Sequence, residues 1–323
     1  MANVISLLQL VKASREVALI VKNKTGKAFL YHFLDYIHCF IKYGCSDNHY
    51  MNEGFYRLRS FDRKNTVTKG RKSKICRAFN DEAATKFFSN KVLFNKTFQD
   101  YIKRDWIYTK EASARELISF ISSHDKIIAK PVNMAKGKGI HMLERTGSIE
   151  ADADQLLKED WLLEEYICQH PAMRWGSNSV NSIRVISVID NKGVLHILKA
   201  GMRCGVGDAI VDNFSAGGGF YPLNLEYGFI DGYGEFGNQI NYSGIHPGTD
   251  KCAIGFQVPH WSEVLSTVGQ AAFVIPSVRY VGWDVAILPD GVELIEGNNG
   301  PGCTLLECIG EKRGFYKEIM SYR

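Results

Sequence analysis

The chain has 323 residues, of which 45% are hydrophobic and 23% are charged. A chain of this length and composition can bury a substantial core, which excludes intrinsic disorder and predicts one large domain or two to three small ones. The 39 Lys and Arg residues exceed the 35 Asp and Glu residues by a formal charge of +4. This excess is too small to indicate a nucleic-acid partner, and an anionic small substrate accounts for it equally well.

The eight cysteines are scattered without a C-x-x-C pair, so neither a zinc site nor a disulfide framework is indicated. We therefore expect a reducing, cytoplasmic location in which most cysteines are small buried hydrophobic residues. The amino-terminal segment is interrupted by Lys12, Arg15 and Glu16 and has no basic leader. It therefore predicts neither a signal peptide nor a membrane span.

The first part of the chain has helical periodicity. Apolar residues recur at helical spacing from Val4 to Phe40, which predicts amphipathic helices. A polar stretch follows, and it contains a basic block between Arg57 and Lys74. This block is either a solvated linker and helix surface or a docking face for a phosphorylated or polyanionic partner. Residues 81–98 then return to a helical pattern.

After Asp105 the chain changes to short β-rich runs separated by Gly, Asn and Pro. Helical patterns at Lys110–Ser123 and Ser262–Ile275 lie among these runs. The combination predicts an α+β or mixed α/β body. The predicted strands are Lys126–Lys130, Trp161–Ile167, Ser182–Val188, Val194–Leu198, Gly282–Ile287 and Gly291–Glu296.

The sequence GWDVAILPDGVELIEGNNGPG predicts two strands joined by a turn at residues 289–291. Alternate residues of a strand share a face, so Glu296 and Asn298 project the same way and the hairpin brings Asp284 alongside them. Two carboxylates and an amide oxygen are ligands suited to one or two Mg²⁺ ions that share ATP phosphate oxygens. The alternative is an acidic hairpin, but the glycine-rich loop that follows favours close approach of backbone to a ligand.

The sequence KIIAKPVNMAKGKGIHML predicts a strand that ends at Lys130 and a loop that contains Lys138 and Gly139. Glycines allow backbone amides to close around phosphates, and Lys130 can contact phosphate oxygens as a point charge. The spacing of a Walker A motif is absent. A plain Gly-Lys hairpin is the alternative interpretation.

The sequence WLLEEYICQHP predicts an apolar strand that ends at Glu164 and Glu165. Backbone groups at such a strand end can bind an adenine edge, and a polar side chain a few residues on can bind the ribose hydroxyls. A strand with an exposed acidic end is the alternative. His170 taken alone is more typical of a surface or satisfied core histidine than of a ligand.

Basic residues recur in the strands between these motifs. Arg184 lies in an otherwise apolar strand, where it needs an anionic partner, either a protein carboxylate or an ATP phosphate. Arg203 with Lys199 could stabilise the charge of a transferring phosphoryl group. The sequence VDNFSAGGG could form a polar loop over the substrate, and its candidate residues are Asn213, Ser215, Gly217 and Gly218.

The order of these fragments resembles the ATP-grasp superfamily from about Asn90 to Gly302, and most specifically at Asp284 with Glu296 and Asn298. The run from NSIRVISV to EGNNGPG looks like the sugar-transfer-associated branch, which is often found with surface-polysaccharide biosynthesis. The resemblance implies an α+β ATP-grasp fold. It further implies a helical region at residues 1–85, a lid and nucleotide-binding subdomain at 86–168, and a catalytic subdomain with a magnesium site at 169–323.

The resemblance also implies roles for individual residues. The nucleotide would be held by phosphate lysines, a flexible lid loop and an adenine hinge, with His170 near the place of an acidic ribose ligand in many relatives. The implied ATP-binding residues are Lys91, Lys130, Lys138, Gly139, Glu164, Glu165, Ile167 and His170. The implied magnesium ligands are Asp284, Glu296 and Asn298, the implied phosphoryl-stabilising cations are Arg184 and Arg203, and Asn299 would line the substrate side.

The expected activity is that of an ATP- and Mg²⁺-dependent ligase that activates a small-molecule carboxylate as an acyl phosphate for attack by an amine. The substrates could be sugar-linked, and a homodimer is the prior for the assembly. One alternative is a kinase for a hydroxyl acceptor, with Asp212 or His246 as general base. Others are a module that binds ATP without turnover and a nucleic-acid binder that uses the basic block, for which no recognition motif accompanies the charges.

Overall fold

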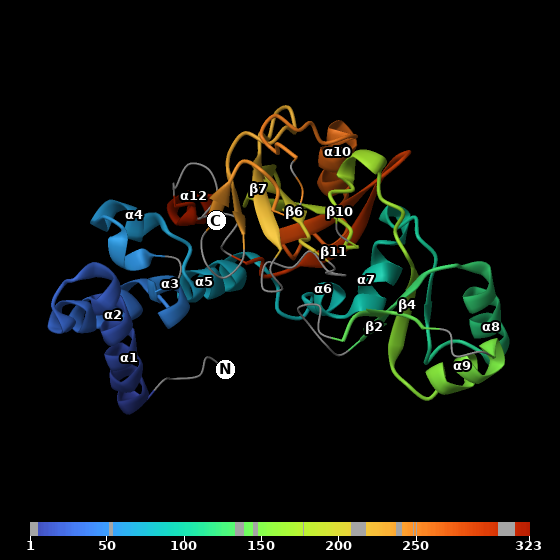
Figure 1. Cartoon of the computed structure of the whole chain (residues 1–323), viewed down its shortest axis with the longest axis horizontal. Helices are drawn as coiled ribbons and strands as arrows, with labels where there is room; N and C mark the ends of the chain where they lie inside the picture. Colours follow the sequence, from blue (N-terminus) through green and yellow to red (C-terminus); the bar gives the residue numbers. More distant parts are fainter. Residues whose placement is uncertain are drawn as a thin grey trace.

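The computed structural model describes residues 6–51, 54–132, 139–144, 148–176, 178–207, 218–236, 241–247, 249, 251–302 and 314–323. A helical region lies at one end of an elongated molecule, a seven-stranded sheet in the middle and a four-stranded sheet at the other end (Figure 1). This mixture of helices and antiparallel sheets confirms the predicted α+β class.

The helical region opens with a hairpin of two helices, which confirms the helices predicted between Val4 and Phe40. Ser6 begins the first helix with a capping box, because its Oγ accepts the Gln9 N–H while Gln9 Oε1 accepts the Ser6 N–H. Inward-facing aromatic residues such as Tyr36 form the core of this region. Its elements are α1 (Leu7–Thr25), α2 (Phe29–Tyr43), α3 (Asp47–Met51), η1 (Phe55–Arg57), α4 (Ser60–Asn65) and α5 (Lys69–Phe79).

The basic block between Arg57 and Lys74 is divided between internal and exposed positions. Arg63 binds Asp35 at 2.6 Å, and Arg71 donates to the backbone oxygens of Arg63 and Thr66. These two arginines therefore stabilise the packing of α2, α4 and α5. The remaining exposed members are Arg57, Arg59, Lys64, Lys69 and Lys74.

The four-stranded sheet is antiparallel, with the order β1-β4-β2-β3. The capping box of Ser113 and Glu116 begins the amphipathic helix α8, whose buried side packs with α9 against the sheet. The predicted strands at Lys126–Lys130 and Trp161–Ile167 are both present. The elements are β1 (Trp106–Tyr108), α8 (Ala114–Ser123), β2 (Ile127–Pro131), β3 (His141–Met142), α9 (Ile149–Leu156) and β4 (Trp161–Glu165).

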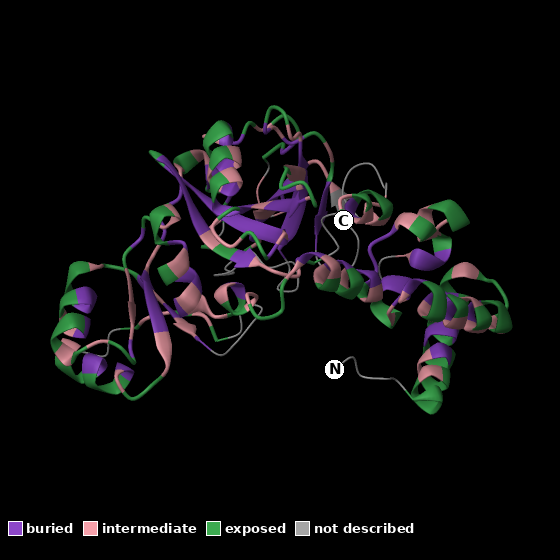
Figure 2. Ribbon diagram, turned by 180° about the vertical axis from the view of Figure 1, so that it is seen from behind, coloured by how far each residue is buried: buried purple, intermediate pink, exposed green. Residues whose placement is uncertain are grey.

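The seven-stranded sheet has the order β11-β10-β5-β6-β7-β8-β9. Its strands are β5 (Ser182–Ile189), β6 (Leu195–Cys204), β7 (Gly219–Leu223), β8 (Gly234–Phe236), β9 (Asn241–Ser243), β10 (Tyr280–Leu288) and β11 (Gly291–Asn298). The strands are buried on both faces, as the purple sheet in Figure 2 shows. The helices and turns around it are α6 (Lys86–Ser89), α7 (Lys91–Thr97), η2 (Gln99–Tyr101), η3 (Pro171–Met173), α10 (Trp261–Ala271) and α12 (Tyr316–Ser321).

Different helices cover the two faces of this sheet. Alternating residues such as Val281, Trp283 and Val285 face α6, α7 and α10, which contribute Phe88 and Val264 among others to the largest hydrophobic cluster. The other face packs against α5 and α12 through a second cluster built around Tyr280, Ile75 and Ile319. The residues of β10 that alternate with Val281, Trp283 and Val285 therefore lie on the α5 side of the sheet, and Asp284 is one of them.

Candidate active site

The hairpin of β10 and β11 places the three predicted metal ligands together. Asp284 is paired with Glu296 across the two strands, and Gly282 is paired with Asn298. Asp284 and Glu296 thus lie side by side, with Asn298 two residues further along the same face, as the alternation in the sequence predicted. A β-bulge follows this pair, because Val285 is opposite Leu294 rather than Ile295.

Two arginines from neighbouring strands bind Asp284, whose side chain is only 3% exposed. Arg184 of β5 contacts Asp284 through Nε and through Nη2, the latter at 2.6 Å from Oδ2, and Arg203 of β6 donates to Oδ2 at 2.9 Å. Burial opposes ionisation of Asp284, but the two guanidinium groups outweigh it and hold its pKa below the ordinary value. The sequence left open whether Arg184 pairs with a protein carboxylate or with an ATP phosphate, and the structure shows the carboxylate of Asp284.

Glu296 is the more open of the two carboxylates. Protein around its carboxyl group displaces water, and Asp284 adds a negative charge, so the pKa of Glu296 is raised. Asn298 Nδ2 donates to Glu296 Oε1 at 3.0 Å, which directs the three side chains toward one another. Two adjacent carboxylates and one amide form a set of hard oxygen donors that fits a divalent cation such as Mg²⁺.

Two predicted phosphate lysines lie beside this cluster. Lys91, the first residue of α7, donates to the Pro131 carbonyl at 2.9 Å and interacts electrostatically with Glu296, Lys130 and Glu164. Burial, supported by Lys130, lowers the pKa of Lys91 despite the two carboxylates. Lys130 of β2 forms an ion pair with Glu164. The structure thus brings both lysines to the junction between the four-stranded sheet and β11.

Glu164 is buried, whereas one interpretation of the sequence was a strand with an exposed acidic end. Its side chain is 3% exposed and binds Arg104 at 2.9 Å as well as Lys130. Asn95 of α7 donates to its Oε1 at 2.9 Å. Burial opposes ionisation of Glu164, but Arg104 and Lys130 overcome it and lower its pKa. The Glu164 side chain therefore holds the basic residues of the junction in position.

Arg104 and Asn95 are residues that the sequence analysis missed. Arg104 joins the two sheets, because it binds Glu164 of β4 and also binds Glu293 of β11 at 3.1 Å. Its Nη1 donates to the Leu294 carbonyl at 2.8 Å. The available sequence signal was Glu293, which lies between the apolar residues Val292 and Leu294, since a buried carboxylate requires a cationic partner.

The segment after β4 matches the predicted hinge in position. Ile167 packs with Ala286 and Leu288, on the same face of β10 as Asp284. These three residues are at most 9% exposed and form an apolar surface next to the polar cluster. Glu165 accepts the Asp105 N–H at 3.2 Å and also lies near His124. His170 Nδ1 accepts the Ala172 N–H at 3.1 Å and begins η3, so this ring nitrogen is already bonded.

The loop after β11 is held by α5 and by Asn80, the C-cap residue of that helix. Asn80 Nδ2 donates to the Asn299 carbonyl at 2.7 Å, and Lys72 donates to the Gly300 carbonyl at 3.3 Å. Gly282 allows this loop to fold back, because a Cβ at Gly282 would lie 2.6 Å from Pro301 Cβ. One member of the basic block therefore contacts the predicted substrate side.

Other predicted site residues lie farther away or outside the described part of the chain. Lys199 is on the same face of β6 as Arg203 but four residues along, about 13 Å at the usual strand rise, and its Nζ lies 5.4 Å from the Phe315 ring centroid. Gly218 is buried just before β7, and Gly139 is exposed just before β3. Lys138, Asp212, Asn213, Ser215 and Gly217 lie outside the described residues.

His246 does not face the carboxylate cluster. It is 1% exposed, and its Nε2 lies 3.1 Å from the Gly205 carbonyl oxygen. Its ring packs against Trp175 and Phe236, which belong to the cluster on the opposite face of the sheet. Burial lowers the pKa of His246. Its location gives no support to a role as general base.

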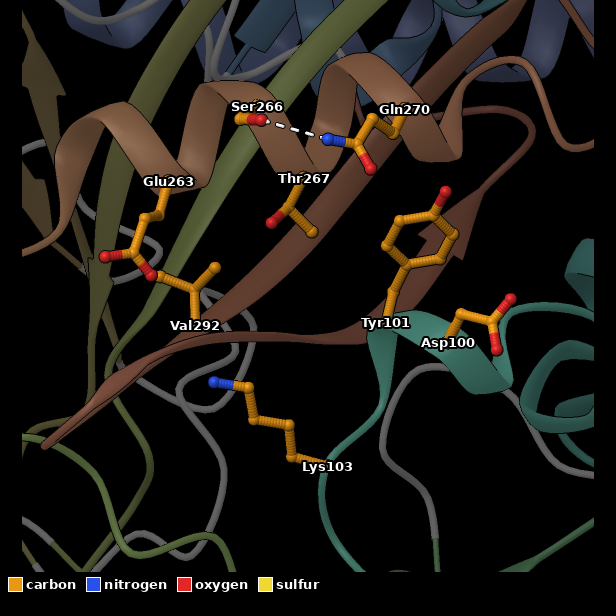
Figure 3. A pocket seen from close by; sticks show the side chains of 8 residues that line it. All are labelled: Asp100, Tyr101, Lys103, Glu263, Ser266, Thr267, Gln270 and Val292. Atoms are coloured by element: carbon orange, nitrogen blue, oxygen red, sulfur yellow. Dashed lines mark hydrogen bonds between the residues drawn. The ribbon is translucent and has the colours of Figure 1, made fainter.

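A small open pocket of about 250 Å³ lies beside α10 (Figure 3). Its lining includes Lys103, Glu263 and Val292. Val292 and α10 belong to the cluster on the face opposite Asp284. This pocket is therefore separate from the candidate active site.

A family model described as sugar-transfer associated ATP-grasp matches residues 70–319. The chain belongs to this family, and the predicted ATP-grasp fold and the resemblance to the sugar-transfer-associated branch are both confirmed. The match includes the two-sheet body and α5, the last helix of the helical region.

The solved structures to which the chain is similar include an ATP-grasp ligase and two synthetases. The ATP-grasp ligase PsnB complexed with minimal precursor, Mg and ADP is 16% identical, with a TM-score of 0.44 over 76% of this chain and 61% of that chain. N5-carboxyaminoimidazole synthetase from Staphylococcus aureus complexed with ADP is 9% identical, with a TM-score of 0.45 over 68% and 46%.

D-alanyl-alanine synthetase A from Vibrio cholerae O1 biovar eltor is 13% identical, with a TM-score of 0.43 over 74% of this chain and 66% of that chain. The chain thus spans about three fifths of the length of PsnB. No curated protein matches its sequence.

Proposed function

We propose that the chain is an ATP-dependent ligase that forms a carbon–nitrogen bond through an acyl phosphate. The observation that supports this most directly is the convergence of Asp284, Glu296 and Asn298 with Arg184 and Arg203 on one sheet face. The apolar surface around Ile167 lies beside this cluster, and Lys91 lies near Glu296. These groups suit the base, the phosphates and the metal of a nucleotide in a single site.

In the proposed site Lys91 and Lys130 bind the ATP phosphates, and Ile167 with Ala286 and Leu288 contacts the adenine. Asp284, Glu296 and Asn298 would hold Mg²⁺, which when bound supplies positive charge to the phosphate oxygens. The depressed pKa of Asp284 keeps this ligand ionised. Burial and the negative charge of Asp284 both raise the pKa of Glu296, so this carboxylate pair is suited to sharing a cation.

The reaction requires no protein nucleophile. In the first step an oxygen of the substrate carboxylate attacks the γ-phosphorus of ATP, and the bond between this phosphorus and ADP breaks. In the second step the amine nitrogen attacks the carbon of the acyl phosphate, phosphate leaves and the nitrogen loses a proton. Arg184 and Arg203, which Asp284 orients, would stabilise the negative charge on the transferring phosphoryl group. Catalysis therefore depends on charge and positioning rather than on covalent chemistry.

We further propose that the substrates are a small carboxylate and an amine, of which at least one is sugar-linked. This narrower proposal rests on the family description, because the candidate substrate loop at Asn213 and Ser215 lies outside the described residues. A cytoplasmic location and a homodimer stay predictions, as do the domain boundaries at residues 85 and 168.

ATP consumption with Mg²⁺ and hydroxylamine, across uronic acids, nucleotide sugars and amino acids, tests the chemistry. Hydroxamate formed together with ADP supports the acyl phosphate and identifies the carboxylate. A phosphorylated product with ADP and without hydroxamate would replace the ligase by a kinase.

Glu296→Gln tests the metal ligands. Removing this negative charge should reduce turnover at least about a hundredfold, because charge stabilisation in an active site is commonly this large. The exposed Glu226→Gln provides a matched control away from the cluster. Steady-state ADP release measures both variants, and turnover of Glu296→Gln equal to that of Glu226→Gln would exclude the metal role.

Lys130→Ala tests the phosphate contact. Loss of a charged hydrogen bond should weaken ATP binding by about tenfold to a hundredfold. Lys126→Ala is the matched control, because Lys126 is exposed in the same four-stranded lobe. Isothermal titration with a non-hydrolysable ATP analogue measures the affinity, and an unchanged dissociation constant for Lys130→Ala would contradict the assignment.

A further inference from the structure

Exposed apolar side chains are concentrated on the α1–α2 hairpin. Nine of the sixteen large hydrophobic residues that are exposed in the described parts of the chain belong to these two helices. They lie at the end of the molecule remote from α8 and α9 (Figure 1). The nine residues are Leu7, Leu8, Val11, Leu19, Ile20, Leu30, Tyr31, Leu34 and Ile41.

On α2 the exposed apolar residues form one continuous stripe. Leu30, Leu34 and Ile41 are 61%, 56% and 72% exposed, and their spacing of four and then seven residues aligns them along one side of the helix. Ile37 completes the stripe at intermediate exposure. The opposite side of α2, which includes Tyr36, is buried in the core of the helical region. The stripe is therefore not needed to fold this region.

The same hairpin carries the excess positive charge of the protein. Six of the 39 basic residues but only two of the 35 acidic residues lie in it, and this difference of four equals the formal net charge of the whole chain. All six basic residues are exposed, whereas of the two acidic residues Glu16 is exposed and Asp35 is paired with Arg63. The basic residues are Lys12, Arg15, Lys22, Lys24, Lys27 and Lys42.

Basic and apolar residues share the outward side of α1 as well. Leu8, Lys12, Arg15 and Leu19 follow one another at spacings of four, three and four residues, so they lie on one face. Figure 2 shows exposed residues along the outer sides of this hairpin. Apolar side chains interleaved with exposed basic ones are the pattern of a helix that lies in the interface of an anionic membrane.

We propose that the α1–α2 hairpin docks the protein on the surface of an anionic lipid bilayer. Leu30, Leu34 and Ile41 insert among the acyl chains near the headgroups, and the six basic residues contact the lipid phosphates. In the described part of the chain no helix is long and apolar enough to cross a bilayer. The two β-sheets lie away from the hairpin and remain outside the lipid.

Charge and shape favour this occupant over a second copy of the chain. A second copy would bring the same six exposed basic residues against the first, which is repulsive, whereas an anionic bilayer complements them. The α2 stripe lies on the outside of a single helix and is convex, so a protein partner would need a matching groove. A fluid bilayer accepts a convex apolar surface without such a groove.

Co-sedimentation of the full chain with two kinds of vesicle tests the proposal. Vesicles of phosphatidylcholine alone should bind weakly, and vesicles with about 30% phosphatidylglycerol should bind at least about tenfold more tightly, with a loss at high salt. Leu34→Glu with Ile41→Glu should abolish binding to the anionic vesicles. Val194→Glu with Phe273→Glu is the matched control, because these residues are 50% and 47% exposed outside the hairpin.

Circular dichroism should show the same melting temperature for both double variants, since all four residues are exposed. Failure of the wild-type chain to bind anionic vesicles would overturn the proposal, as would equal binding by the two double variants. A wild-type dimer in light scattering that Leu34→Glu with Ile41→Glu converts to a monomer would instead assign the stripe to a second copy. Lys22→Gln with Lys24→Gln should weaken anionic-vesicle binding several-fold, and unchanged binding would contradict the charge contribution.

Discussion

Replacing Arg104 by Met should destabilise the protein strongly, because Arg104 neutralises two buried carboxylates. Its side chain is 2% exposed, and those of Glu164 and Glu293 are 3% and 1% exposed. In the variant Glu164 would keep Lys130 and Asn95, whereas Glu293 would keep the backbone N–H groups of residues 103 and 104. Breaking a buried ion pair from one side typically costs about 3–5 kcal/mol.

Chemical unfolding in urea, followed by tryptophan fluorescence, measures this loss. Arg279→Met is the matched control, because the Arg279 guanidinium donates to the backbone oxygens of Ile189 and Ala78 and pairs with no carboxylate in the described part of the chain. We expect a loss of about 1–2 kcal/mol for the control, from its hydrogen bonds and its contact with the Phe79 ring. The reasoning is refuted if Arg104→Met costs no more than Arg279→Met.

Two further predictions concern the same junction and the loop after β11. The pKa of Glu164 is lowered because Arg104 and Lys130 outweigh its burial, so its stabilisation is complete above the ordinary carboxyl pKa of about 4.3 and is lost as the pH falls toward the folded value. The difference in unfolding free energy between wild type and Glu164→Gln should therefore shrink from about pH 6 to pH 3, and a constant difference would contradict it. Asn80→Ala removes the bonds to Asn299 and Tyr280 and should cost about 1–3 kcal/mol in urea unfolding. It should also raise the KM for the carboxylate more than that for ATP, and an equal rise would contradict a role on the substrate side.

The geometry of the β10–β11 hairpin could be predicted because it depends on local rules. Strand alternation and the turn at residues 289–291 determine that Asp284 and Glu296 lie side by side, and the observed register agrees. The strands β7, β8 and β9 were missed because β8 and β9 are only three residues long and their segments are rich in glycine and turns. Such segments have little periodicity of their own and depend on pairing with neighbouring strands.

The junction between the sheets could not be predicted, since its contacts join residues far apart in the sequence. Glu164 and Glu165 point to opposite sides of β4, but the sequence does not tell which side is buried. The answer depends on Arg104, which is 60 residues from Glu164 and 189 residues from Glu293. The sequence showed three charged residues without showing that they bind one another.

The arginines at Asp284 show why two predicted alternatives need not exclude each other. Arg184, in an otherwise apolar strand, required an anion, and the candidates were a protein carboxylate and an ATP phosphate. Asp284 accepts hydrogen bonds from Nε and Nη2 of Arg184 and from Nη1 of Arg203. Asp284 therefore fixes the orientation of both guanidinium planes on the sheet face where we propose that the phosphoryl group binds. In that arrangement the carboxylate positions the cations before the nucleotide arrives, which lowers the cost of ordering them during the reaction.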